Sequence, residues 1–177
     1  MTASKFLDNV RALCGLYNYD ECDCMTVIRK ALNISFSGTN WLFRSVNNAS
    51  KYRYLSERHK MGDGTPPPGA ILFKTRDAIP PGYSDKPDAY HCGVLDNDGY
   101  VIHSSPSTGP RKDYNSRADD WQYWGLMKQV DYEDISFSGE SGNGGNSSVN
   151  NLDIPTQSDQ MTDRQLLEAI YNAVVRD

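Results

Sequence analysis

The sequence lacks long apolar runs and a basic cluster, and it contains few cysteines and histidines. No stretch approaches the roughly 20 consecutive apolar residues that a bilayer crossing needs, so we expect no membrane span. Lys and Arg number 18 against 23 Asp and Glu, which gives a net charge of −5. An acidic chain without a basic stripe is a poor match for a phosphate backbone, so we expect no nucleic-acid partner.

The beginning of the chain, Met1 to Phe6, contains no long apolar signal region. We therefore expect synthesis in the cytoplasm without a signal peptide. The four cysteines do not show the spacing of a disulfide framework, and 177 residues can form a core without one. Their thiols are then available for reactive or metal-binding chemistry.

Apolar residues repeat with helical spacing in two early segments. The first runs from Ser4 to Cys14 and is ended by Gly15, and the second runs from Cys24 to Leu32 with Asp23 as its N-cap. A further helix is expected around Tyr52 to His59. These patterns place Cys24 in the first turn of its helix.

Strand signals dominate the later part of the sequence. Ala70 to Phe73 is an apolar run bounded by turn residues, and Trp121 to Val130 can supply another strand. Between them, His91 to Leu95 and Tyr100 to His103 flank the turn Asn97-Asp98-Gly99, which predicts a hairpin. Helices followed by strands favour an α+β domain.

The composition changes near residue 138. Residues 138–160 are rich in Gly, Ser and Asn and predict a flexible linker, and 161–177 predict an amphipathic helix. The expected organisation is a domain over 1–137, the linker, and the C-terminal helix. That helix either docks on a partner, self-associates, or packs back on the domain.

Cys24 is the first candidate for chemistry. The N-terminus of a helix has unpaired N–H groups and a partial positive charge, which favour a thiolate and can bind an oxyanion. A buried cysteine that acts as a small hydrophobic residue fits the same helical pattern.

Two of the three histidines, His91 and His103, lie on opposite arms of the predicted hairpin. A three-residue turn pairs His103 with Gly93, so both imidazoles share a face and are diagonal neighbours. One ring can then orient the other, as in a catalytic triad. Two half-exposed histidines without a partner are the alternative interpretation, which we adopt for His59.

A zinc site is a further possibility, because the thiols of Cys22, Cys24 and Cys92 and the imidazole of His91 form a suitable ligand set. However, the one-residue gap between Cys22 and Cys24 is tighter than usual. Adjacent residues of a strand, such as His91 and Cys92, also point to opposite faces. We therefore expect no metal and no other cofactor.

These motifs, in this order, resemble the NlpC/p-sixty family of papain-like cell-wall cysteine peptidases. Asp23-Cys24-Met25-Thr26-Val27-Ile28 is similar to the family's Asp-Cys-Ser-Gly-Leu-Val, and Pro68-Gly69-Ala70-Ile71-Leu72-Phe73 to its Pro-Gly-Asp strand. His91-Cys92-Gly93-Val94-Leu95 and Ile102-His103-Ser104 resemble its two histidine strands. The departures are Met25 and Thr26 for Ser-Gly, Ala70 for Asp, and the absence of Tyr-x-x-Gly-Gly before the cysteine.

The resemblance implies an α+β, papain-like fold in which N-terminal helices pack on a small antiparallel sheet. It also implies Cys24 as nucleophile, His91 as base and His103 as the orienting third member, with Asp23 and Tyr17 at the substrate. The implied activity is an endopeptidase that cleaves peptidoglycan stem peptides between γ-D-glutamate and the diamino acid. No cofactor is required.

Two other functions remain open. One is an N-acetylmuramoyl-L-alanine amidase with the same triad. The other is a non-catalytic structural or cell-wall-binding module of a phage tail. A phage origin, as a tail component or a free lysin, would bring a chain without a signal peptide to the bacterial cell wall.

Overall fold

The computed structural model describes residues 1–36, 38–48 and 50–136. The predicted linker 138–160 and C-terminal helix 161–177 lie outside the described residues. The helices are α1 (Ala3–Ala12), α2 (Cys24–Leu32) and α3 (Thr39–Arg44), with short 3-10 turns at Ser45–Asn47, Ser50–Tyr52 and Ala118–Asp120. The strands are β1 (Leu55–Lys60), β2 (Ile71–Arg76), β3 (Asp88–Leu95), β4 (Tyr100–Ser105), β5 (Gly109–Arg117) and β6 (Tyr123–Met127).

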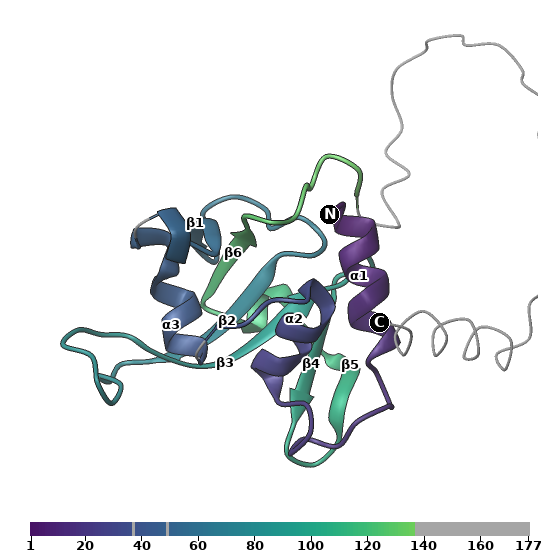
Figure 1. Cartoon of the computed structure of the whole chain (residues 1–177), viewed down its shortest axis with the longest axis horizontal. Coiled ribbons are helices and arrows are strands. Elements are labelled where there is room, and N and C mark those ends of the chain that lie inside the picture. The colour runs from purple at the N-terminus through teal and green to yellow at the C-terminus, as the bar shows by residue number, and fades with distance from the viewer. Residues whose placement is uncertain (37, 49, 137–177) are drawn as a thin grey trace, which may run out of the picture. The chain divides into compact units, whose positions relative to one another are not determined.

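The six described strands form one antiparallel sheet in the order β1-β6-β2-β3-β4-β5 (Figure 1). The helices come first in the chain and the strands follow, so the α+β class expected from the sequence is correct. Helix α2 contacts β3 and β4, α1 packs on α2, and α3 contacts β3. Helix α2 therefore lies against the half of the sheet that carries β3 and β4.

Local signals account for α2. One carboxylate oxygen of Asp23 accepts a hydrogen bond from the Thr26 N–H at 2.7 Å, which caps the helix N-terminus. Asn33 ends the helix in the left-handed conformation, with φ of 52°. Both ends lie where the sequence predicts them. Helix α1 also forms, but it ends two residues before Cys14.

The helix predicted around Tyr52 to His59 is wrong, because Leu55–Lys60 is strand β1. It pairs with β6, where His59 lies opposite Trp124. The Arg58 guanidinium lies over the ring of Phe43, 4.0 Å from its centroid. Contacts with residues distant in sequence therefore override the local preference.

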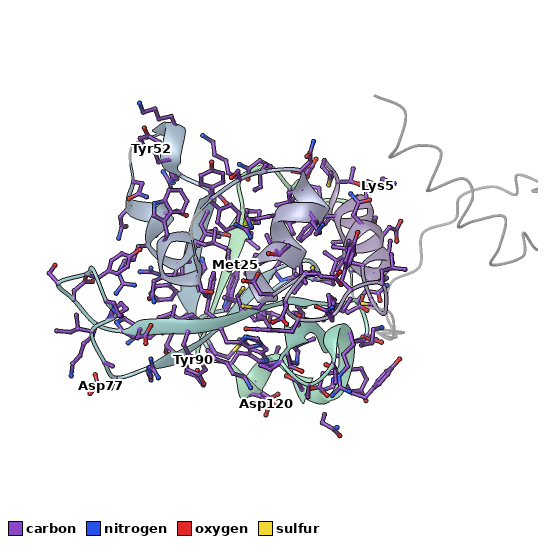
Figure 2. All side chains as sticks on the ribbon, turned by 60° about the horizontal axis from the view of Figure 1, so that its bottom comes forward. Lys5, Met25, Tyr52, Asp77, Tyr90 and Asp120 are labelled. Atoms are coloured by element: carbon purple, nitrogen blue, oxygen red, sulfur yellow. The ribbon has the colours of Figure 1, made fainter. Side chains whose placement is uncertain are left out.

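Apolar side chains cover both faces of the sheet. On one face, helix residues such as Phe6, Leu7 and Ile28 pack with Phe73 and Val94. Figure 2 shows the side chains of this layer, with Met25 inside it. The opposite face carries a smaller cluster formed by Ala70, Leu72, Leu95, Val101, Trp121 and Trp124.

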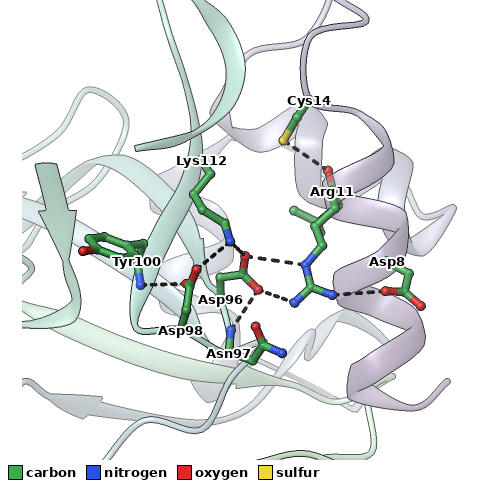
Figure 3. A network of polar contacts seen from close by, with 9 residues as sticks. Asp8, Arg11, Cys14, Asp96, Asn97, Asp98, Tyr100 and Lys112 are labelled. Carbon is green, nitrogen blue, oxygen red and sulfur yellow. Dashed lines mark hydrogen bonds and ion pairs between the residues drawn. The ribbon is translucent and has the colours of Figure 1, made fainter. Parts of the chain in front are cut away.

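A buried ionic network links α1 to the β3–β4 turn and to β5 (Figure 3). The Asp96 carboxylate, with a fully buried side chain, accepts hydrogen bonds from Arg11 and Lys112, each at 2.5 Å. Lys112 also contacts Asp98 at 2.8 Å. Burial disfavours the ionised carboxylate, but the hydrogen bonds from Arg11 and Lys112 overcome this and lower the pKa of Asp96.

Within the described residues, no helix has the length and apolar character needed to cross a bilayer.

Candidate active site

Cys24 is the first residue of α2, and its side chain is 7% exposed. The first N–H groups of a helix have no partner within the helix, so the sulfur lies beside donors that can bind an anion. Thr39, the first residue of α3, places its hydroxyl oxygen 3.9 Å from the sulfur. The site thus combines a nearly buried sulfur with polar hydrogens around it.

The surroundings of Cys24 lower the pKa of its thiol to about 4. The largest contribution is a hydrogen bond from the Cys92 thiol; burial opposes ionisation, and a hydrogen bond and positive charge from His91 favour it. Burial raises the pKa of Cys92 well above its ordinary value, so Cys92 keeps its proton, and its sulfur also lies 3.3 Å from that of Met25. These surroundings therefore favour the thiolate form of Cys24 at neutral pH.

A β-bulge in β3 determines which side chains reach the site. Lys74 of β2 lies opposite His91, but Thr75 lies opposite Ala89, so Tyr90 is an extra residue. As a result, Ala89 and Cys92, three residues apart, both face the helix-side core. His91 contacts Trp121 of the opposite cluster, with ring centroids 5.5 Å apart and an interplanar angle of 23°. Bulges commonly re-aim side chains in this way.

The two hairpin histidines meet as the turn predicts. Val94 pairs with Ile102 and Leu95 with Val101, which is the register of a three-residue turn, and Gly99 has the expected positive φ of 82°. His91 Nε2 lies 3.0 Å from His103 Nδ1. His91 thus contacts a second imidazole, while its hydrogen bonding and charge help to lower the pKa of Cys24.

Gly93 is required where the two histidines approach each other. A β-carbon at this position would lie 2.7 Å from Val101 Cγ1, 3.1 Å from Trp121 Cη2 and 3.2 Å from His103 Cβ. The missing side chain lets Trp121 pack under both imidazoles. The indole N–H of Trp121 donates to Ser116 at 3.0 Å, which holds the ring in place.

Asp113 is a site residue that the sequence interpretation missed. It lies on β5, and its Oδ2 is 3.2 Å from His103 Nε2. The turn residues Pro106 to Gly109 were a usable signal for a further hairpin. Strand β5 was not predicted, because Arg111, Lys112 and Asp113 are charged in succession and show no alternation of apolar and polar residues.

The two predicted substrate residues, Asp23 and Tyr17, have different surroundings. Asp23 directly precedes the nucleophile and uses one oxygen to cap α2. Tyr17 lies under Lys30, whose Nζ is 4.5 Å from the ring centroid. It lines an open hollow of about 410 Å³ between residues 15–19 and 106–109. Tyr19 lines the same hollow; burial raises its pKa, and the charge of Cys24 adds to this.

Across the described ranges, no three His, Cys, Asp or Glu side chains are grouped so that they could hold a metal ion. No protein-family model matches the chain, and no curated protein matches it significantly. The chemical interpretation therefore depends on the arrangement of Cys24, His91, His103 and Asp113.

Proposed function

We propose that this chain is a cysteine hydrolase of the NlpC/p-sixty type, with a papain-like arrangement of Cys24, His91 and His103. The observation that carries the proposal is geometric: Cys24 is the first residue of α2, and His91 Nε2 lies 3.0 Å from His103 Nδ1. The lowering of the Cys24 pKa to about 4, to which His91 contributes, supports it. A thiolate poised in this way is a strong nucleophile, whereas a structural cysteine stays protonated.

The proposed reaction begins from the ion pair of the Cys24 thiolate and the His91 imidazolium. The thiolate attacks an amide carbon, and N–H groups in the first turn of α2 stabilise the resulting oxyanion. Collapse of the intermediate breaks the C–N bond while His91 donates its proton to the leaving amine. His91 then takes a proton from water, which attacks the thioester and releases the acid, so the ion pair is restored.

The proposed substrates are stem peptides of bacterial peptidoglycan, cleaved between γ-D-glutamate and the diamino acid. This assignment is based on the resemblance of the Cys24, His91 and His103 motifs to the family. In it, the Asp23 carboxylate binds a substrate amine, and Tyr17 contributes to the pocket. Action on the cell wall is compatible with a free lysin or a virion component.

Product analysis tests this proposal. The purified protein is incubated with muropeptides of known structure, and the products are identified by mass spectrometry. Cleavage at γ-D-glutamate is expected, whereas release of intact stem peptides would identify an amidase. Cys24→Ala should abolish cleavage, and Cys14→Ala, which removes a thiol outside the site, should retain it. Failure of the wild-type protein to cleave any muropeptide would favour a non-catalytic module.

A further inference from the structure

Three side chains on three successive strands form a continuous hydrogen-bonded row. His91 Nε2 on β3 is 3.0 Å from His103 Nδ1 on β4, and His103 Nε2 is 3.2 Å from Asp113 Oδ2 on β5. In the β4–β5 register His103 lies opposite Arg111, so Asp113 is its diagonal neighbour on the same face. Across β3 and β4, His103 lies opposite Gly93 in the register of the three-residue turn, so His91 is likewise its diagonal neighbour.

The row has one direction of hydrogen-bond donation. An ionised carboxylate only accepts, so His103 must carry its hydrogen on Nε2. A neutral imidazole has one N–H, which makes His103 Nδ1 an acceptor. His91 Nε2 must then donate to it, and Nδ1 is the remaining nitrogen of His91 that can exchange a proton with Cys24.

The protonation states along the row fit this direction. The Asn115 backbone N–H and the His103 imidazole lower the pKa of Asp113, which keeps it ionised. Burial lowers the pKa of His103 against the opposing effect of Asp113, which favours the neutral ring. The other charged groups that act on this row are Cys24 from α2, Lys74 from β2 and Arg111 from β5.

Asp113 is itself held in position. Its Oδ1 accepts the Asn115 backbone N–H at 2.9 Å, so the two carboxylate oxygens have separate partners. The preceding residue, Lys112, points the opposite way into the buried pair with Asp96. The carboxylate can therefore select one orientation of the His103 ring.

We propose that Asp113 is a positioning residue that acts through His103 and fixes the tautomer of His91 required for proton exchange with Cys24. This inference rests on the proposed function. Without the carboxylate, His103 can carry its hydrogen on Nδ1 and donate it to His91 Nε2. Neutral His91 would then hold its hydrogen on Nδ1 and could not also carry one on Nε2, so the imidazolium of the ion pair with Cys24 would be disfavoured. Asp113 excludes this inactive arrangement.

The tautomers can be read directly by nitrogen NMR of histidine-labelled protein. The chain has three histidines, so variants of His59 and His103 assign all the signals. Wild-type His103 should show protonated Nε2 and unprotonated Nδ1. In Asp113→Asn, which preserves the side-chain shape, this single tautomer should be replaced by a mixture. Asp77→Asn, which removes an exposed carboxylate in the loop after β2, is the matched control and should leave the spectrum unchanged.

The same variants should differ in turnover. Loss of a residue that orients a catalytic group typically costs about 10- to 100-fold, and we expect that loss in kcat for Asp113→Asn, with KM little changed. A His103 tautomer that is Nδ1–H in the wild type, or is identical in Asp113→Asn, would overturn the inference. The spectra need no substrate, so an inactive wild-type protein would refute the hydrolase and leave the tautomer result standing.

Discussion

Replacing His91 with alanine should change how the reactivity of Cys24 depends on pH. With a pKa of about 4, the thiol of the wild-type protein is almost fully ionised at pH 6. An ordinary thiol with a pKa near 8.5 would be only about 0.3% ionised at that pH. The reaction of Cys24 with a small neutral disulfide, such as dithiodipyridine, should therefore be nearly constant in rate from about pH 5 to 8 in the wild type.

The size of the change follows from the lost contact. An opposite charge at contact distance lowers the pKa of an acid by about 1–3 pH units, so His91→Ala should move the inflection to about pH 5–7. The hydrogen bond from Cys92 remains in this variant and keeps the pKa below that of a free thiol. At pH 5, the ionised fraction of Cys24 should fall roughly twofold to 100-fold relative to wild type.

The comparison of pH profiles is more informative than a single rate. A low-pKa thiolate is intrinsically less nucleophilic, with a Brønsted slope of about 0.4–0.5, so its advantage at pH 6 is only a few-fold. Stopped-flow rates with mass-spectrometric identification of the modified cysteine separate Cys24 from the others. His59→Ala, which removes an imidazole on β1, is the matched control. An unchanged inflection in His91→Ala would refute the ion pair.

Three further predictions concern the support of this site. Gly93→Ala should destabilise the protein by about 1–3 kcal/mol in urea unfolding, because the added methyl overlaps Val101 and crowds Trp121 and His103. His103→Ala should lower kcat less than loss of His91, since His103 only orients the base; equal activity with wild type would remove it from the site. Asp96→Ala should cost about 3–5 kcal/mol, because Arg11 and Lys112 lose their buried partner. Since the pKa of Asp96 is lowered, this difference in unfolding free energy should be present at neutral pH and shrink as the pH falls through that pKa.

The parts of the site that could be predicted depend on local information. The turn Asn97-Asp98-Gly99 determines the register of its hairpin, and Gly99 takes the left-handed position. Counting residues along the two strands from this turn therefore predicts that His91 and His103 share a face. The Asp23 cap similarly placed Cys24 at the start of α2. Each of these features is specified by fewer than a dozen consecutive residues.

Other parts could not be predicted because their causes are distant in sequence. Strand β1 pairs with β6, so Leu55 lies opposite Met127, and no local pattern indicates that partner. The bulge at Tyr90 appears only when β2 and β3 are aligned, and it brings Ala89 and Cys92 to the same face of the sheet. Asp113 was missed because its strand is charged on both faces.

A comparison of single and double variants tests the central claim most directly. Hydrolysis of a muropeptide is measured for Cys24→Ala, His91→Ala and the variant with both changes. The effects of replacing groups that act as one unit do not add. Each single change should therefore remove nearly all turnover, and the double variant should lose no more. Substantial hydrolysis by Cys24→Ala, or losses that multiply in the double variant, would contradict a shared thiolate–imidazolium pair.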